Sequence, residues 1–432
     1  MNEETKKRIA AINSGIIPEG YKKTKVGIVP VEWDRYKLSD ISDELTEKAG
    51  NNPYETLSIS AGIGFVNQAN KFGKELSGKQ YEKYIILHKG DFSYNKGNSK
   101  KYPQGCIYQL KDRDEAAVPN VFESFRLNKG INDYYEQLFV SGFLNRQLFA
   151  KINHGVRDDG LLNLKGEDFY SCYVLSPPLP EQQKIAEILS TQDKLIELQE
   201  KKIEQLKELK KAYLQKMFPK KGSKYPELRF KGFTDPWEQR ELGELVEFYN
   251  GDRSSRYPND SDMVSDGVPF INAGDLVSGR VKLDTANKIT EEKFNELSGA
   301  KIQRGDIIYC LRGTLGKNAF VDNFDVGTVA SSLVDIRPKK VVGKYLFQVL
   351  NSDIEYTQRT VNDEGAAQPN LSAKNLSLFN IPMPDEIEQE KIAAYFDDLD
   401  RLITLHQRKS EQEKQKKKAL MQLLLTGKMR CK

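Results

Sequence analysis

One charged stretch occurs twice in this sequence. Residues 181–196 read EQQKIAEILSTQDKLI, and residues 388–403 read EQEKIAAYFDDLDRLI, 207 positions later. Without gaps, residues 181–218 match residues 388–425 at 17 of 38 positions. Because this period is far longer than that of any solenoid repeat, the sequence predicts two duplicated domains that end in similar helices.

The duplication extends to two further markers. Residues 31–41 (VEWDRYKLSDI) resemble residues 235–245 (DPWEQRELGEL), which aligns Trp33 with Trp237, the two tryptophans of the chain. A Gly-Asp-x-x-Tyr element recurs in residues 89–97 and 304–313. The segments between the markers match poorly. Similar edges indicate a shared structural role, and dissimilar bodies indicate two different ligands held by one kind of scaffold.

The composition fits a protein with solvated helices. The chain has 432 residues, enough for two or three domains, and 30% of them are charged. The net charge of +4 comes from 66 basic and 62 acidic residues. This balance does not by itself indicate nucleic-acid binding, although local basic patches would still attract phosphate.

Residues 181–218 are predicted to form one long helix. Three prolines precede the stretch, Pro219 follows it, and its apolar residues recur at a spacing of three or four. These residues are Ile185, Leu189, Ile196, Ile203, Leu206, Tyr213 and Met217. The second helix is expected to end at Gly427 and has no apolar residue at 406–418. We expect the two helices to pack antiparallel, with uneven contact because Ser410 and Glu413 align with Ile203 and Leu206.

The predicted fold class is α+β, with two duplicated mixed α/β domains separated by two long, coiled-coil-like helices. The expected boundaries are a first domain at 1–180, a helix at 181–218, a linker at 219–236, a second domain at 237–387 and a helix at 388–426. Within the bodies, residues 134–152 and 343–359 each read as one amphipathic helix.

No pattern for catalysis, a cofactor or a metal stands out. The four cysteines form no Cys-x-x-Cys pair, and there are three histidines, so a zinc site is not expected. NNPYETL at 51–57 lacks the glycine-rich cofactor turn of a methyltransferase, and LRGTLGKNA at 311–319 lacks the glycine and hydroxyl residue of a P-loop. With no signal peptide or apolar run of membrane length, we expect a cytoplasmic protein that is not an enzyme and contacts no membrane.

The loops that follow the Gly-Asp strands are candidate DNA-binding surfaces, because Lys and Arg neutralise phosphates and Asn and Arg pair with base edges. A second candidate surface precedes each Pro-rich segment. The candidates are Tyr94, Asn95, Lys96, Asn98, Lys100, Lys101 and Arg157 in the first half, and Tyr309, Arg312, Thr314, Lys317, Gln368 and Asn370 in the second. Any one of these could instead belong to a solvated basic loop, and Asn163 and Asn370 could be caps.

Taken together, these motifs resemble the specificity subunits of type I restriction–modification systems. The resemblance rests on two variable domains that each have a Trp-x4-Leu entry, a Gly-Asp-x-x-Tyr element and a Pro-rich lead into Glu-Gln-x-Lys-Ile-Ala. It runs from about Ile17 to Lys428. It implies that each variable domain is a target recognition domain that reads one half of an asymmetric, bipartite site on double-stranded DNA.

The resemblance also implies partners. The two helices would set the spacing between half-sites and dock two methyltransferase subunits, through positions such as Gln182, Ile185, Ile196, Gln389, Ile392 and Ile403. Those subunits would carry S-adenosylmethionine, and restriction subunits would use ATP and Mg²⁺ for translocation and cleavage. This chain would bind no cofactor itself. The alternatives are a coiled-coil scaffold or protein-interaction adaptor without DNA specificity, and an enzyme with an unrecognised site.

Overall fold

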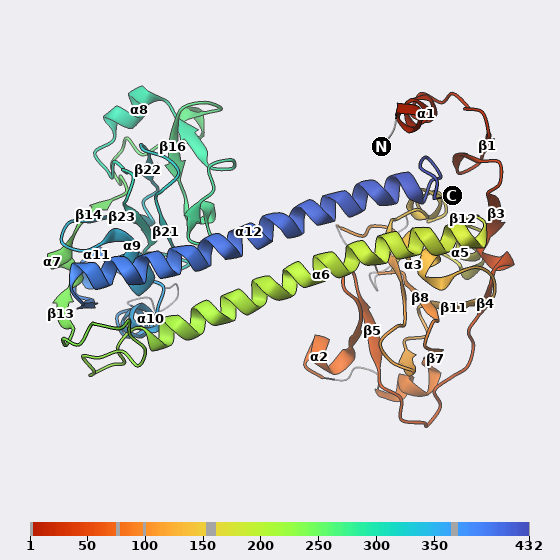
Figure 1. Cartoon of the computed structure of the whole chain (residues 1–432), viewed down its shortest axis with the longest axis horizontal. Helices are drawn as coiled ribbons and strands as arrows, with labels where there is room; N and C mark the ends of the chain where they lie inside the picture. Colours follow the sequence, from red (N-terminus) through yellow and green to blue (C-terminus); the bar gives the residue numbers. More distant parts are fainter. Residues whose placement is uncertain (1–2, 75–77, 98–100, 153–160, 364–369, 432) are drawn as a thin grey trace. The chain divides into compact units, whose positions relative to one another are not determined.

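The chain forms two compact units in a computed structural model that describes residues 3–74, 78–97, 101–152, 161–363 and 370–431 (Figure 1). Unit 1 consists of Met1–Gln199 with Lys409–Lys432, and unit 2 is Glu200–Arg408. The division falls inside both long helices, α6 (Leu179–Lys216) and α12 (Glu386–Leu424). Each unit therefore contains part of both helices, whereas the sequence had suggested separate helical segments.

Unit 1 is a mixed α/β body. Its helices before α6 are α1 (Glu3–Asn13), α2 (Gln68–Phe72), α3 (Asn132–Val140), α4 (Asn145–Phe149) and α5 (Gly166–Tyr170). Its strands are β1 (Tyr21–Thr24), β2 (Gly27–Pro30), β3 (Asp34–Lys37), β4 (Ser42–Glu44), β5 (Leu57–Ser60), β6 (Gly64–Asn67), β7 (Ile85–His88), β8 (Phe92–Asn95), β9 (Cys106–Gln109), β10 (Glu115–Val118), β11 (Glu123–Leu127) and β12 (Tyr173–Ser176).

Unit 2 has a comparable set of elements. Its helices before α12 are α7 (Leu242–Leu245), α8 (Glu291–Glu296), α9 (Gly343–Val349), α10 (Asp353–Val361) and α11 (Ala373–Ser377). Its strands are β13 (Glu238–Glu241), β14 (Val246–Asn250), β15 (Met263–Val264), β16 (Val268–Ile271), β17 (Leu276–Val277), β18 (Arg280–Val281), β19 (Asn287–Ile289), β20 (Ile307–Cys310), β21 (Asn318–Phe320), β22 (Thr328–Val329), β23 (Leu333–Pro338) and β24 (Asn380–Met383).

The central sheets of the two units have the same topology. In unit 1 the antiparallel order is β4-β11-β8-β9, and in unit 2 it is β14-β23-β20-β21. A two-stranded ribbon accompanies each sheet, β3 with β12 and β13 with β24. The remaining strands differ: unit 2 has a second sheet, β15-β19-β16-β22, whereas unit 1 has the separate pairs β5-β6 and β7-β10. The frame is thus duplicated, and the divergence lies in the added strands.

The shared sequence markers form the cores. Trp33, Leu38 and Ile41 are buried in unit 1, and Trp237 and Leu242 are buried in unit 2. The ribbon registers correspond as well, because the backbone N–H of Leu38 donates to Cys172 O at 2.8 Å and that of Leu242 donates to Phe379 O at 2.8 Å. The segment that begins with the tryptophan is therefore part of the core in both units.

The two predicted body helices are each divided into two shorter helices. In unit 1, α3 and α4 are separated by a turn in which Gly142 has a φ of +77°, a conformation that favours glycine. In unit 2, the Ser352 side chain accepts the Ile354 N–H and caps the start of α10. The prediction of single helices at 134–152 and 343–359 was therefore wrong, because local turn and capping chemistry interrupts each apolar pattern.

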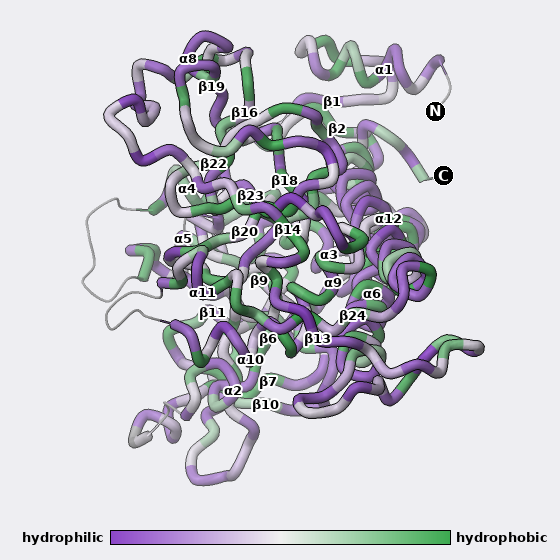
Figure 2. The backbone as a smooth tube through the Cα atoms, turned by 90° about the vertical axis from the view of Figure 1, so that its left-hand side faces the viewer, coloured by the Kyte–Doolittle hydropathy of each residue, from purple (hydrophilic) through white to green (hydrophobic). Residues whose placement is uncertain are grey.

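The long helices pack against each other within each unit. In unit 1, Ile185 and Leu189 of α6 share a core with Leu424 at the end of α12. In unit 2, Leu206 near the end of α6 shares a core with Ile392 near the start of α12. The beginning of one helix thus meets the end of the other, which confirms the predicted antiparallel pairing. Figure 2 shows the mixed hydropathy of both helices, with hydrophobic residues interspersed among hydrophilic ones.

Candidate nucleic-acid interface

The recurring Gly-Asp-x-x-Tyr element is a turn that leads into a central strand. Asp91 Oδ2 accepts the N–H of His88 at 2.7 Å, and Asp306 Oδ2 accepts the N–H of Gln303 at 2.7 Å. The preceding glycine, Gly90 or Gly305, has a φ near +100°, which few other residues adopt. The motif recurs because the same tight turn is needed before β8 and β20.

Each of these buried aspartates also binds an arginine of the neighbouring strand. Arg126 donates hydrogen bonds from Nε to Asp91 Oδ1 at 2.7 Å and from Nη2 to Asp91 Oδ2 at 2.9 Å. Arg337 binds Asp306 in the same bidentate way, at 3.0 and 2.8 Å. The sequence reasoning missed both pairs, because Arg126 and Arg337 follow their aspartates by 35 and 31 positions, in β11 and β23. These charges stabilise the sheet and are not free to bind phosphate.

The tyrosines of this element are core residues, which corrects their assignment to the DNA-binding surface. Tyr94 and Tyr309 have no exposed surface. Tyr94 stacks on Phe169 at 4.7 Å between ring centroids and donates to Gln104 O at 2.9 Å. The hydroxyl of Tyr309 donates a hydrogen bond to Glu355. Burial raises the phenol pKa of both Tyr94 and Tyr309. Neither side chain can reach DNA in this structure.

The other candidates of unit 1 differ in accessibility. Asn95 is occupied in the turn, where its Oδ1 accepts the Gly97 N–H at 2.8 Å. Lys96 binds Glu123 at 2.8 Å and has only 16% of its side chain exposed. Lys101 is exposed and lies near the Tyr102 ring. The predictions for Asn98, Lys100 and Arg157 lie outside the described residues.

In unit 2, Arg312 and Thr314 are exposed in the loop between β20 and β21. Lys317 is partly buried and donates to Ala273 O at 2.6 Å, so its ammonium group is engaged inside the unit. Asn370 is partly exposed, and its N–H donates to Asp363 Oδ1 at 2.9 Å. Gln368 lies outside the described residues.

The structure joins the two surfaces that the sequence could only name separately. In unit 2, Arg312 and Asn370 form an antiparallel bridge, and the N–H of Leu371 donates to Leu311 O at 2.9 Å. In unit 1, Gly97 and Leu161 form the matching bridge, and the N–H of Leu162 donates to Lys96 O at 2.8 Å. We call this seam the paired edge; it comprises residues 95–97 and 161–163 in unit 1 and residues 311–314 and 370–371 in unit 2.

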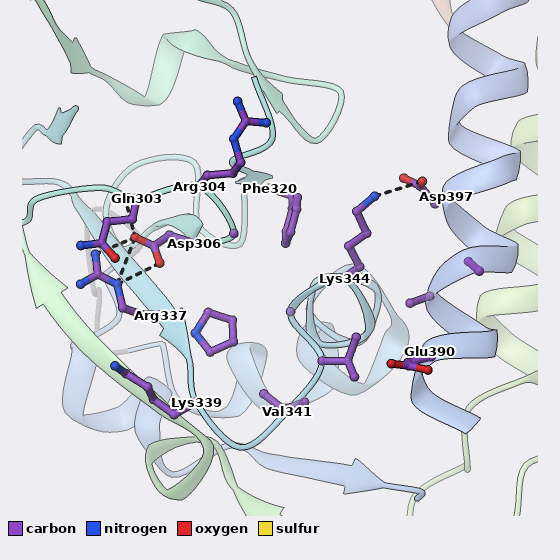
Figure 3. Close-up of a pocket in the computed structure, with 16 residues that line it drawn as sticks. Gln303, Arg304, Asp306, Phe320, Arg337, Lys339, Val341, Lys344, Glu390 and Asp397 are labelled. Atoms are coloured by element: carbon purple, nitrogen blue, oxygen red, sulfur yellow. Dashed lines mark hydrogen bonds and ion pairs between the residues drawn. The ribbon is translucent and has the colours of Figure 1, made fainter. Parts of the chain in front are cut away.

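A cavity of about 670 Å³ in unit 2 is lined by several basic residues (Figure 3). Their charges are already paired. Arg337 binds Asp306, and Lys344 binds Asp397 at 3.0 Å, as Figure 3 shows. Arg304 binds Asp325, and Lys339 binds a glutamate of β14. Because the carboxylates of Asp306, Glu390 and Asp397 also line this cavity and repel phosphate, the cavity is a weaker nucleic-acid candidate than the exposed residues of the paired edge.

The residues predicted to dock partners hold the long helices in their own units. Gln182 is buried, accepts the Ile131 N–H at 2.9 Å and donates to Pro177 O at 2.8 Å. Gln389 makes the equivalent contacts with Val342 and Pro384, at 3.0 and 2.9 Å. Ile185 and Ile392 are core residues, whereas Ile196 and Ile403 are partly exposed. The four buried side chains are therefore not available to a partner.

A buried tryptophan–glutamate–arginine cluster lies at the start of each long helix. Trp33 Nε1 donates to Glu181 at 3.0 Å, and Trp237 Nε1 donates to Glu388 at 3.2 Å. Arg430 adds a bidentate contact to Glu181, as Arg229 does to Glu388. Burial acts to raise the pKa of Glu181, but the hydrogen bonds from Arg430 and Trp33 outweigh it and hold the pKa below its usual value. The sequence reasoning found the tryptophans and glutamates but not their contact.

A second duplicated cluster links the two helices within each unit. In unit 1, Asp193 of α6 binds Lys417 of α12 at 2.5 Å and accepts a hydrogen bond from Gln137 at 2.9 Å. In unit 2 the roles are exchanged, because Asp400 belongs to α12 and binds Lys210 of α6 at 2.8 Å. The available signal was the identity of both Asp and Lys between the two repeats.

Among the described residues, no group of His, Cys, Asp and Glu is arranged to hold a metal ion. In the same part of the chain, none of the helices has the length and apolarity needed to cross a membrane.

Comparisons with known proteins agree over both halves. The family model of the type I restriction modification DNA specificity domain matches residues 30–208 and 234–415. The putative MjaX specificity subunit of Methanocaldococcus jannaschii is 26% identical over 444 residues, covering 96% of this chain and 97% of the relative. The type I enzyme EcoBI specificity subunit of Escherichia coli is 23% identical, covering 79% of this chain and 78% of the relative.

Solved structures show the same fold. A chain from a study of complex assembly and conformational transition in a type I R-M system superposes with a TM-score of 0.54 at 16% identity, covering 93% of this chain and 99% of that one. The type I S subunit from M. genitalium gives a TM-score of 0.52 at 16% identity, covering 93% and 96%. With the family model matched across both units, this chain belongs to the type I restriction–modification DNA specificity family.

Proposed function

We propose that this chain is the non-catalytic DNA-specificity subunit of a type I restriction–modification complex, in which each unit reads one half of an asymmetric, bipartite DNA site. The observation that carries the proposal is the double family match, which covers the two bodies as well as the helices. A scaffold without DNA specificity is not favoured, because the helices alone would then account for the resemblance.

The paired edges are the proposed DNA-reading surfaces. They occupy equivalent positions next to β8 and β20, but they present different side chains. Unit 2 exposes Arg312 and Thr314, whereas the described loop of unit 1 exposes Lys101 just beyond its edge. Arginine can form a bidentate contact with guanine, and lysine chiefly neutralises phosphate, so two unlike edges support two unlike half-sites.

The reaction itself would be carried out by partner subunits. We propose two methyltransferase subunits that hold S-adenosylmethionine, together with restriction subunits that use ATP and Mg²⁺. The surface of α6 and α12 is the proposed docking region, with Ile196 and Ile403 as its predicted contacts, because these two remain partly exposed. The helices would also set the spacing between half-sites, and their 38 and 39 residues correspond to lengths of about 57 Å and 58 Å.

Mapping of methylated bases tests the proposal. The chain is co-expressed with its methyltransferase subunits in a host that lacks other methylation, and the genome is sequenced for modified bases. A bipartite motif is expected, and replacing residues 245–370 with the body of a relative should change only one half. Absence of any methylated motif that depends on this chain would contradict the function, and a change in both halves would contradict independent reading.

Salt dependence provides a second test with purified protein. Binding to DNA through phosphates should weaken steeply as salt rises, because each neutralised phosphate releases counterions. A scaffold that binds only protein would show no such dependence on duplex DNA. Methylation by this chain without added subunits would instead support an enzyme.

A further inference from the structure

In each unit, α6 packs against α12 at one position that we call the helix crossing. The crossings of the two units occupy equivalent positions in the repeat, but the side chains at them differ in polarity. In unit 1, the buried side chain of Gln192 in α6 donates a hydrogen bond to Glu413 of α12. The repeat, with its offset of 207, aligns Gln192 with Leu399 and Glu413 with Leu206. In unit 2 these two leucines are both buried in the apolar core. One crossing therefore has an amide–carboxylate pair where the other has two leucines.

We infer that this difference specifies which long helix pairs with which, favouring α6 with α12 of the same chain over the pairing of identical helices from two copies. The competitor follows from the duplication. Because α6 and α12 share 17 of 38 residues, two copies of α6 could align antiparallel in the same register. A contact that disfavours this pairing is needed only if the remaining contacts between the helices are equally favourable when two identical helices pair.

The other inter-helix contacts do tolerate the pairing of identical helices. The ion pair of Asp193 with Lys417 would be replaced by Asp193 with Lys210 of the second copy, because Lys210 is the repeat equivalent of Lys417. The apolar contacts also survive, since Leu424 is replaced by Met217, another buried apolar residue. Neither the ion pair nor the apolar ends can therefore distinguish the two pairings.

The polar crossing does distinguish them. A pair of α6 helices would place Gln192 against Leu206 of the other copy at both crossings, and a pair of α12 helices would place Glu413 against Leu399. Each mismatch deprives a polar side chain of its partner inside an interface, which is far more costly than exchanging one apolar contact for another. A buried polar residue that fixes helix partners at some cost in stability is a known use of such groups. Ser410, which is buried in α12 and aligns with Ile203, adds to the asymmetry.

The test compares three full-length chains. The first is the natural chain. The second is the all-leucine chain, Gln192→Leu with Glu413→Leu, in which both crossings are apolar and every pairing is matched. The third is the transposed chain, Gln192→Leu, Glu413→Leu, Leu206→Glu and Leu399→Gln, which moves the polar pair to unit 2 and restores the mismatch of identical helices.

Two differently tagged copies of each chain are co-expressed, and the recovery of one copy with the other is measured. The chains are also refolded from denaturant over a range of concentrations, and their mass is measured by light scattering. The all-leucine chain should self-associate at least about tenfold more than the natural chain, because each of the two polar mismatches that it removes costs about 1–3 kcal/mol. The transposed chain should return to the natural level.

The transposed chain separates partner choice from ordinary domain swapping. Exchange of an intact α6–α12 pair between copies keeps every crossing matched, so it would be equal in all three chains. Equal self-association of all three chains would overturn the inference, as would an increase in both variants. If the transposed chain is recovered unfolded, the natural and all-leucine chains still decide, because replacing a buried polar pair with leucines preserves folding in known cases.

Discussion

The indole Nε1 of Trp33 donates a hydrogen bond to the carboxylate of Glu181 at 3.0 Å, which ties the entry of unit 1 to the start of α6. Trp237 and Glu388 repeat this contact in unit 2 at 3.2 Å. Since the tryptophans and glutamates are far apart in sequence, the contact explains why the duplicated edges are conserved between the two halves of this chain while the bodies differ. The edges hold the long helices to the bodies.

Removing Glu388 should strongly destabilise unit 2. Glu388→Ala leaves the indole N–H of Trp237 and the guanidinium of Arg229 without their buried partner. The expected loss in the free energy of unfolding is about 3–5 kcal/mol, as for other broken buried ion pairs. Hydrogen exchange of the backbone amides of β23, which lies in unit 2, measures it.

The matched control is Glu386→Ala, two residues earlier on an exposed part of the same helix. It removes one carboxylate from the first turn of α12 and should cost less than about 1 kcal/mol. Similar losses for the two variants would show that Glu388 acts through the helix dipole and not through its buried contacts.

Asp335 should make unit 2 less stable as the pH rises. This side chain is fully buried in β23, and burial together with the nearby Asp306 carboxylate raises its pKa to about 8. A raised pKa means that the folded unit keeps a proton that the unfolded chain loses near pH 4. The stabilising contribution is therefore complete below about pH 4 and is lost as the pH rises through about 8.

Asp335→Asn keeps the shape of this side chain and removes the titration. The variant should show a flatter dependence of unit 2 stability between about pH 5 and 8, measured by hydrogen exchange in β20 and β23. The pH dependence that Glu181 gives to unit 1 has the opposite sign. Because the pKa of Glu181 is lowered in the folded state, its contribution to the stability of unit 1 is lost only as the pH falls into the acid range. An unchanged slope in the variant would exclude Asp335 as the source of the pH dependence.

The sequence predicted the long helices that support the two units better than it predicted which residues lie on the DNA-binding surface. The prolines around 181–218 and the apolar stripe led correctly to a long helix, because helix length and periodicity are local properties. The antiparallel pairing of the two helices was predicted from the duplication, since duplicated units that face each other form a two-fold arrangement. The burial of Tyr94 and Tyr309 could not be read in the same way. In β20 all four residues are buried, with Ile307 and Tyr309 in one core and Ile308 and Cys310 in another, so a strand covered on both faces shows no alternation.

The paired edges show a second limit of sequence reasoning. Residues Arg312 and Asn370 are separated by more than fifty positions, and only the backbone bridge between them reveals one surface. Gln182 and Gln389 show a third limit. A glutamine on a polar helix reads as exposed, yet both are buried because backbone groups of a loop and a proline satisfy their amides.

The Asp306–Arg337 pair should be needed for stability and not for DNA recognition. Asp306→Asn removes one charge of the bidentate pair and should lower the free energy of unfolding of unit 2 by about 2–4 kcal/mol. The methylated motif should stay unchanged in the variant that remains folded. A changed motif at low temperature, where folding is retained, would show that the turn contributes to recognition.

Arg312 should contribute to only one half of the DNA site. Its side chain is exposed at the paired edge of unit 2, so Arg312→Ala should fold normally and lose about 1–3 kcal/mol of discrimination if the contact is to a base. If the contact is to phosphate, binding should weaken for all sequences and the salt slope should fall by about 1. Titration of the assembled methyltransferase complex with matched and mismatched duplexes separates the two results.

Arg304→Ala is the matched control for Arg312, because Arg304 is also an exposed arginine of unit 2 but lies away from the paired edge and binds Asp325 at 2.7 Å. It should leave affinity, salt slope and motif near those of the natural chain. Equal effects of the two substitutions would mean that unit 2 responds to its total charge. An effect confined to Arg312, and to one half of the motif, would assign that half to the paired edge of unit 2.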